Sequence, residues 1–243
     1  MISSAEIKFV KSLSQKKFRD SSGLFTVEGD KMVSEALASG FTVEKVYRRD
    51  EIGSSAMERM SALSSPSPSL ALVRKREEPP YSCPSSGLFL ALDGIRDPGN
   101  LGTIVRLSSW YGIDGIFASP DTVELYNPKV VQATMGAIFK VRFMTVDIPS
   151  LCRDTIAAGG NVYGTFLDGS DIYSVPLDNG ETAPAVIVIG NEASGICAET
   201  ASCVSSRLFI PRYPAGAASG PESLNAAVAT AITVAEFRRR ARR

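Results

Sequence analysis

Three glycine-rich polar segments hold most of the residues that could do chemistry. They run from Asp93 to Arg106, from Gly190 to Gly195 and from Pro211 to Asn225, and each follows an apolar run typical of a β-strand. The chain has no histidine, which excludes the usual general base and the Ser–His and Cys–His nucleophile pairs. Any chemistry must therefore use Arg, Lys, Asp, Glu, Ser, Asn and backbone groups.

None of these segments carries a common nucleotide-binding or hydrolase signature. The GNLG stretch lacks the first glycine of G-x-G-x-x-G, G-x-x-x-x-G-K-[ST] is absent, and the sequence around Ser194 is not a G-x-S-x-G elbow. The four cysteines include no C-x-x-C pair, which fits neither a disulfide framework nor a zinc site. The sequence therefore lacks the main motifs of dinucleotide-dependent oxidoreductases, P-loop enzymes and serine hydrolases. No bound metal is expected.

The elements that must position these segments alternate between strands and helices. Strands are expected over residues 88–93, 115–119, 161–166, 185–190 and 207–211, and helices over about 100–111, 128–135, 150–158 and 223–240. Nearly continuous apolar strands that alternate with helices predict an α/β fold, a mostly parallel sheet with helices on both faces. Ligands of such sheets bind beyond the carboxyl ends of the strands, so the three segments are expected at one edge.

A smaller α/β unit precedes this sheet. Residues 24–29, 43–49 and 70–77 read as strands, and 30–40 and 51–63 as helices. Two segments rich in serine and proline, 64–68 and 79–86, indicate loops near the end of this unit. Domains over 1–85 and 86–243 are expected.

Charge and hydropathy give weaker indications about partners. Basic and acidic residues balance at 26 each, but basic residues cluster between Lys8 and Arg19 and between Arg238 and Arg243. Either cluster could contact phosphates or form a solvated helix face. No apolar run approaches the roughly 20 residues that cross a bilayer, and the N-terminus lacks the apolar region of a secretory signal. A cytoplasmic protein without membrane contact is expected.

Taken together, the three segments resemble the motifs of the SpoU/TrmH family of RNA ribose 2′-O-methyltransferases, in the SPOUT superfamily. The matching stretches, in order, are DPGNLGTIVRLSSWYGI, VIVIGNEASGI and FIPRYPAGAASGPESLNAAVATAI, which place the resemblance over about residues 87–240. The resemblance implies an α/β domain whose C-terminal segment threads a trefoil knot. It also implies S-adenosylmethionine bound in that knot, an RNA substrate, and a homodimer that completes the site.

The same resemblance assigns roles to individual residues. It implies that Arg106 is essential for catalysis. Because arginine stays protonated in proteins, we expect Arg106 to clamp a neighbouring phosphate and polarise the ribose hydroxyl. The other matched polar residues of the motifs are Asn100, Glu192, Ser223 and Asn225, and those implied to bind the cofactor are Thr165, Leu167, Gly190, Ile210 and Leu224. Three alternatives stay open: Asn100 could cap the first helix, Ser223 could cap the last, and Glu192 could be structural.

The N-terminal unit, from about Ser12 to Leu37, resembles a substrate-binding domain similar to the ribosomal L30e fold. It implies a structured RNA target, ribosomal RNA in preference to transfer RNA; a free-standing α/β core is the alternative. The loop from Arg212 to Glu222 is longer than is usual in the family, which leaves the pocket geometry open. Two competing functions are a non-catalytic RNA-binding or ribosome-assembly factor and a Rossmann-type oxidoreductase.

Overall fold

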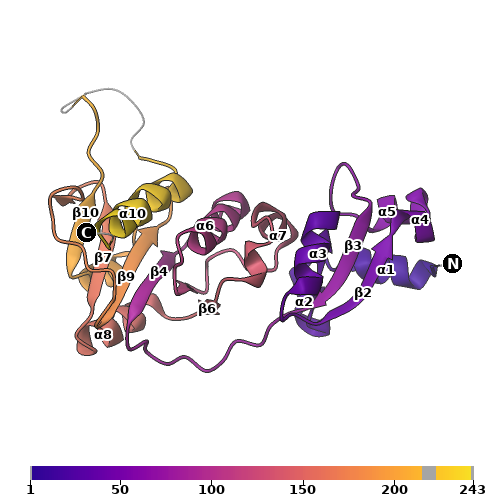
Figure 1. Cartoon of the computed structure of the whole chain (residues 1–243), viewed down its shortest axis with the longest axis horizontal. Coiled ribbons are helices and arrows are strands. Elements are labelled where there is room, and N and C mark those ends of the chain that lie inside the picture. The colour runs from indigo at the N-terminus through magenta and orange to yellow at the C-terminus, as the bar shows by residue number, and fades with distance from the viewer. Residues whose placement is uncertain (1, 215–222, 242–243) are drawn as a thin grey trace. The chain divides into compact units, whose positions relative to one another are not determined.

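The computed structural model describes residues 2–214 and 223–241 and divides into two compact units (Figure 1). The N-terminal unit contains Met1–Glu77 with Glu124–Lys140, and the C-terminal unit contains Glu78–Val123 with Val141–Arg243. The segment 124–140 lies beyond the boundary expected near residue 85, yet it packs with the N-terminal unit. The functional division into 1–85 and 86–243 stays a prediction.

The N-terminal unit is built on a three-stranded antiparallel sheet in the order β1-β3-β2. The strands are β1 (Leu24–Glu28), β2 (Val43–Arg48) and β3 (Ser69–Arg74). The helices are α1 (Ser4–Ser12), α2 (Lys16–Ser22), α3 (Asp30–Ala38), α4 (Arg49–Ile52), α5 (Ser54–Met60), α7 (Pro128–Ala133) and the 3₁₀ helix η1 (Ala137–Phe139). The single helix expected over 51–63 is wrong: α4 ends and α5 begins around Gly53, whose φ of 85° breaks the helix.

The C-terminal unit contains a seven-stranded sheet in the order β6-β5-β4-β9-β7-β10-β8, with every pairing parallel. Its strands are β4 (Gly87–Asp93), β5 (Gly115–Ala118), β6 (Phe143–Thr145), β7 (Asn161–Phe166), β8 (Ser170–Asp171), β9 (Pro184–Gly190) and β10 (Ser206–Phe209). Its helices are α6 (Pro98–Trp110), α8 (Ile148–Ala157), α9 (Ala198–Ser202) and α10 (Ala226–Ala241). The expected mostly parallel α/β sheet is confirmed.

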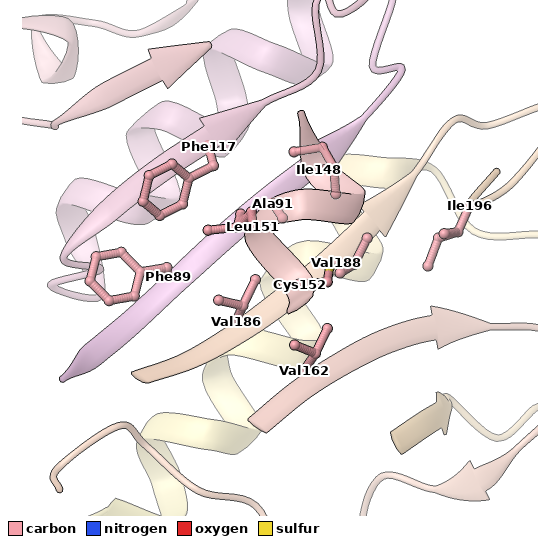
Figure 2. Close-up of a cluster of buried hydrophobic side chains, with 10 residues drawn as sticks. All are labelled: Phe89, Ala91, Phe117, Ile148, Leu151, Cys152, Val162, Val186, Val188 and Ile196. Carbon is pink, nitrogen blue, oxygen red and sulfur yellow. The ribbon is translucent and has the colours of Figure 1, made fainter. Parts of the chain in front are cut away.

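The central strands are apolar along almost their whole length because both of their faces are covered. On one face, Ala91 of β4 and Val186 of β9 pack against Leu151 of α8, as Figure 2 shows. On the other face, Tyr163 of β7 meets Phe237 of α10 edge to face, with ring centroids 5.0 Å apart. Alternate residues of one strand thus fill two separate cores.

Strand register brings four carboxyl ends to one edge of this sheet. Asp93, the last residue of β4, pairs with Gly190, the last residue of β9, and Phe166 at the end of β7 pairs with Phe209 at the end of β10. The segments that follow these strands therefore begin side by side. Within residues 2–214 and 223–241, no helix is long and apolar enough to span a membrane.

Candidate functional site

A chain of hydrogen-bonded side chains links the three polar segments at this edge. Asn225 donates from Nδ2 to Oδ1 of Asn100 over 2.8 Å, and Asn100 donates from its own Nδ2 to Oε1 of Glu192. Asn100 and Asn225 lie 125 residues apart in sequence. The structure therefore brings one residue from each motif into a single polar network.

The direction of this network follows from the start of α10. Oδ1 of Asn225 accepts hydrogen bonds from the backbone N–H groups of Ala227 and Val228, at 3.0 and 3.2 Å. The amide can then offer only its NH₂ group to Asn100, so the Asn100 oxygen accepts and its NH₂ group faces the Glu192 carboxylate. A carboxylate offers only hydrogen-bond acceptors. Each donor in this network of three side chains therefore faces an acceptor.

The two helix-capping alternatives considered for Asn100 and Ser223 are wrong. Asp97 caps α6, because its Oδ1 accepts from the backbone N–H of Asn100 over 2.8 Å and Pro98 follows it. Asn225 caps α10 through the bonds described above. Ser223 is exposed, and its side chain has no hydrogen-bond partner within the described part of the chain, which leaves its hydroxyl available.

The turn that carries Glu192 is closed by its own backbone and by Asn191. Asn191 and Gly195 exchange two backbone hydrogen bonds of 3.0 and 2.9 Å, and the Asn191 side chain donates to the carbonyl of Gly94 over 2.7 Å. A Cβ on Gly190 would lie 2.3 Å from the carbonyl carbon of Gly195. Only glycine fits there, which gives Gly190 a steric role in shaping the turn.

The segment after β4 is held from two further directions. Asp93 accepts from the backbone N–H of Cys197 over 2.8 Å, and Ser119 accepts from the N–H of Gly94 over 2.9 Å. The Ser119 hydroxyl donates to Asp121 over 2.6 Å, and this bond is the main reason that the pKa of Asp121 lies below its usual value. The start of α6 is therefore fixed before any ligand binds.

Arg106 and Asn100 lie on different faces of α6. Six residues of an α-helix turn through about 600°, which places the two side chains about 120° apart around the helix axis. Asn100 is 9% exposed, whereas Arg106 is exposed and has no hydrogen bond or ion pair with any described residue. A guanidinium in these surroundings is free to bind an external anion.

The residues expected to bind the cofactor follow three adjacent strands. Gly190 ends β9, Thr165 lies near the end of β7, and Ile210 follows β10. The Thr165 hydroxyl donates to the carbonyl of Val188 over 3.2 Å, so its backbone rather than its hydroxyl is left for a ligand. Leu167 and Leu224 are exposed apolar side chains. Apolar side chains beside strand-end backbone groups suit a nucleoside held mainly by the main chain.

The described arginines of the C-terminal basic cluster have partners inside the unit. Arg238 donates to the carbonyl of Tyr111 over 2.9 Å and to that of Gly112, while Arg240 donates to Ile172 over 2.8 Å. Arg238 therefore ties the C-terminal end of α10 to that of α6, as Asn225 and Asn100 tie their N-terminal ends. This arrangement disfavours a phosphate-binding role for Arg238 and Arg240.

Sequence reasoning missed Asp97, Asn191, Asp93 and Arg238. The spacing D-x-x-N before a helical pattern is a capping signal that could have revealed Asp97. The partners of the other three lie far away in sequence, so no local pattern points to them. Among the described residues, no group of three or more His, Cys, Asp or Glu side chains could hold a metal ion.

Two family models match separate parts of the chain, and their boundary is close to the one expected from the sequence. Residues 87–235 match the model of the SpoU rRNA Methylase family. Residues 4–74 match the model of the MRM3-like substrate binding domain. The first match covers more than half of the chain and contains all three polar segments.

Individual relatives agree with these matches. The 23S rRNA (guanosine(2553)-2'-O)-methyltransferase RlmP of Bacillus subtilis is 28% identical, over 96% of both chains. A structure from Porphyromonas gingivalis, classed as an RNA methyltransferase of the TrmH family, superposes with a TM-score of 0.88 at 35% identity, over 99% of each chain. The AdoMet-bound rRNA methyltransferase of Sinorhizobium meliloti gives a TM-score of 0.85 at 29% identity, over 99% of this chain and 97% of that one. The chain belongs to the SpoU rRNA methylase family.

Proposed function

We propose that this protein transfers a methyl group from S-adenosylmethionine to a ribose 2′-hydroxyl of RNA, with ribosomal RNA preferred over transfer RNA. The observation that carries the proposal is the network of Asn225, Asn100 and Glu192, which joins the three motif segments at one edge of the sheet. Relatives named as ribosomal RNA methyltransferases support the substrate class. The match of the N-terminal unit to a substrate-binding domain supports it as well.

The chain's own residues suit binding of this cofactor through the backbone. β7, β9 and β10 end together, Gly190 has no side chain to block the edge, and Ile210 and Leu224 offer apolar surface to an adenine ring. When bound, S-adenosylmethionine supplies a methyl group made electrophilic by its sulfonium. No metal is needed to activate such a group.

The ribose hydroxyl must be aligned with the methyl group and must lose its proton. Arginine stays protonated in proteins, so Arg106 donates hydrogen bonds and does not accept the proton. It binds the phosphate next to the target nucleotide and polarises the hydroxyl, while the phosphate or a water molecule takes the proton. The hydroxyl of Ser223 orients the ribose, and Asn225, which bonds to Asn100 and to the backbone N–H groups of Ala227 and Val228, orients the start of α10.

Three finer features complete the proposal: a trefoil knot formed by the C-terminal segment, a homodimer, and a cytoplasmic location. The homodimer is supported by exposed apolar side chains on the paired helices α6 and α10, namely Trp110 and Val228. Trp110 follows Arg106 by four residues and shares its face of α6. A second copy that covers Trp110 would therefore lie next to the catalytic arginine.

Calorimetric titration of the isolated protein with S-adenosylmethionine tests the proposal. We expect saturable binding without RNA, because the polar network already fixes the strand-end segments. A lack of binding at millimolar cofactor, in protein shown to be folded, would favour the non-catalytic RNA-binding factor. Binding of NAD(P) in its place would favour an oxidoreductase.

A further inference from the structure

The N-terminal unit contains a cavity of about 310 Å³. It lies between β1, the turn after α5 and α7, and its apolar wall includes Leu63, Pro128 and Val131. All of the lining residues belong to this one unit. The cavity is distinct from the strand-end site, whose residues belong to the C-terminal unit.

Two polar side chains that line the cavity lack hydrogen-bond partners among the residues that the structure describes. Thr26 is 8% exposed and Gln132 is half-buried, and neither has a side-chain hydrogen bond to any described residue. Solvent reaches the polar atoms of both side chains, so the Thr26 hydroxyl and the Gln132 amide are available to hydrogen-bond a ligand in the cavity.

A fixed carboxylate lies beside Thr26. Thr26 and Glu28 alternate along β1, so their side chains point to the same face, and Glu28 is 5% exposed. Its two oxygens accept from the Ser61 hydroxyl and the Ala62 N–H over 2.5 and 2.7 Å. A carboxylate has about four acceptor positions, so Glu28 retains capacity for N–H donors while its position is fixed.

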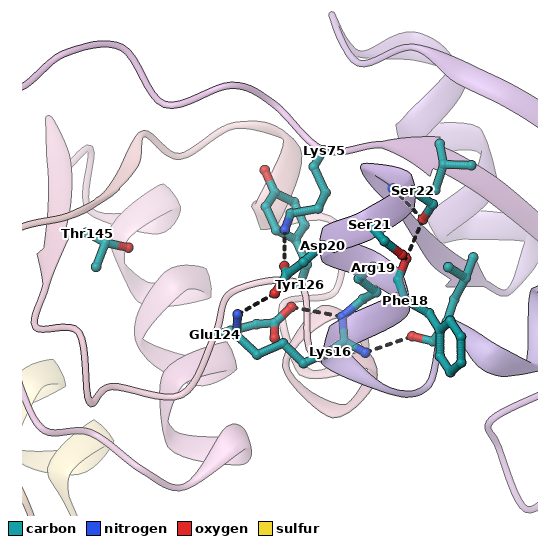
Figure 3. Close-up of polar contacts among 12 residues, drawn as sticks. Lys16, Phe18, Arg19, Asp20, Ser21, Ser22, Lys75, Glu124, Tyr126 and Thr145 are labelled. Atoms are coloured by element: carbon teal, nitrogen blue, oxygen red, sulfur yellow. Dashed lines mark hydrogen bonds and ion pairs between the residues drawn. The ribbon is translucent and has the colours of Figure 1, made fainter.

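The α7 wall is anchored by residues on its N-terminal side. Arg19, which is 2% exposed, forms an ion pair with Glu124 over 2.8 Å (Figure 3). The rings of Phe25 and Tyr126 lie 4.7 Å apart. The approach to α7 is therefore fixed against α2 and β1.

Residues on the C-terminal side of α7 anchor the same wall. The rings of Phe41 and Phe139 lie 5.2 Å apart in an edge-to-face arrangement. Lys140 pairs with Glu35 of α3 over 2.9 Å. Because α7 is held on both sides, the cavity is preformed and does not depend on a ligand to shape it.

We propose that this cavity receives one nucleobase turned out of the RNA substrate. Its volume lies at the low end of the roughly 300–1,000 Å³ typical of small-ligand sites, which suits a single planar ring system. The apolar walls would contact the faces of the base, and Thr26, Glu28 and Gln132 would bind its polar edge, favouring a base with N–H donors. Lys129, exposed at the cavity, would bind the adjoining phosphate. The inference rests on the proposed RNA substrate.

The test compares two tryptophan variants of the full-length protein. Ala62 lines the cavity but is exposed, so Ala62→Trp can fill the cavity without disturbing the core or its backbone bond to Glu28. Ser55→Trp adds the same side chain at an exposed position of α5 outside the cavity and is the matched control. Gln132→Leu is a second variant, which removes hydrogen-bonding groups at similar volume.

Filter binding to ribosomal RNA at fixed salt gives the readout, with circular dichroism and urea denaturation of each variant as the check on folding. We expect Ala62→Trp to weaken RNA binding at least about tenfold, as loss of one well-held base contact would, and Gln132→Leu to weaken it several-fold, with Ser55→Trp unchanged. Wild-type RNA affinity in folded Ala62→Trp overturns the inference and leaves the proposed methyl transfer standing. A protein that never methylates RNA, yet loses RNA affinity in Ala62→Trp alone, contradicts the proposed function and supports the cavity.

Discussion

Arg106 and Asn100 lie on one helix, and their surroundings separate the two tasks of the site. Asn100 is buried and bonded to residues from both other motifs, so it holds the segments together. Arg106 is exposed and unpaired among the described residues, so it contributes little to stability. The sequence shows only two polar residues in one motif, whereas burial and hydrogen bonds separate Asn100, which joins the segments, from Arg106, which we propose to be catalytic.

Arg106→Ala is expected to abolish methyl transfer while leaving S-adenosylmethionine affinity within a few-fold of the wild type. Because the side chain has no internal partner, stability should change by no more than about 0.5 kcal/mol. Arg142→Ala, at another exposed arginine of the same unit, is the control and should remain active. Parallel loss of transfer and cofactor affinity in Arg106→Ala would instead place Arg106 in the cofactor site.

Asn100→Asp is expected to break the network, because it replaces the donor to Glu192 with a second carboxylate. Leaving partly buried groups unpaired should cost about 1–3 kcal/mol of unfolding free energy, measured by urea denaturation, and cofactor affinity should fall. Asn161→Asp is a matched control. Asn161 begins β7, at the end of the strand away from the site, and also donates to a carboxylate, that of Asp178, over 3.1 Å. If both variants lost stability but bound cofactor equally well, the network would have no role in shaping the site.

Much of the site could be predicted from residue types, and the rest depended on long-range contacts. Asn100, Glu192 and Asn225 were expected together because their motifs follow parallel strands, and the structure joins them. Asn191 and Asp93 could not be predicted, since each becomes important through a partner about a hundred residues away. The long loop from Arg212 to Glu222 lies mostly outside the described residues, so its influence on the pocket stays a prediction.

Among the elements, α6 and α10 together determine the geometry of the site. Asn225 and Asn100 join their N-terminal ends, and Arg238 joins α10 to the carbonyls that end α6. The sequence predicted both helices from their periodicity. It could not indicate that the arginines at the end of α10 bind carbonyls, because a solvated basic cluster has the same composition.

Glu236 of α10 should make stability depend on acid pH. Hydrogen bonds from Arg239 and Arg240 lower the pKa of Glu236 from 4.5 to about 2. A carboxyl whose pKa is lowered in the folded state stabilises the fold at pH values above its unfolded pKa. The contribution of Glu236 to the free energy of unfolding should therefore be lost as pH falls from about 4.5 to about 2. Since Arg239 is half exposed, we expect this contribution to be about 1–2 kcal/mol, less than the full pKa shift would give.

Chemical denaturation of Glu236→Gln across that pH range checks this expectation. The variant should be less stable than the wild type at neutral pH and should approach it as the pH falls towards about 2. Glu199→Gln, at an exposed glutamate of α9, is the control and should follow the wild type throughout. A stability gap for Glu236→Gln that stayed constant from neutral to acid pH would rule out the ion pairs as its cause.

The N-terminal unit shows where element-level prediction fails. α1 and α2 cover the basic stretch from Lys8 to Arg19, for which the sequence left the structure open. Arg19 itself is buried and paired with Glu124, so it is not part of a basic surface. The packing of residues 124–140 with this unit was not predictable, because their expected helix is the same in either unit and only tertiary contacts decide its place.

At the scale of the whole molecule, the proposed homodimer depends on the lone tryptophan. Trp110 is 83% exposed on the face of α6 that carries Arg106. Trp110→Glu should leave the fold intact and convert a micromolar dimer into a monomer in sedimentation experiments, because it places a charge in an apolar interface. Tyr173→Glu, at another exposed aromatic residue of the C-terminal unit, is the control. A wild-type monomer at micromolar concentration would contradict the homodimer.

The most direct measurement of the central claim is the identity of the methylated nucleoside. Ribosomal RNA from cells that lack the protein is incubated with the purified enzyme and methyl-labelled S-adenosylmethionine, digested to nucleosides and analysed by mass spectrometry. The account predicts one labelled 2′-O-methylnucleoside, which is absent with Arg106→Ala and present with Arg142→Ala. Label on a base, or label that persists with Arg106→Ala, would contradict it.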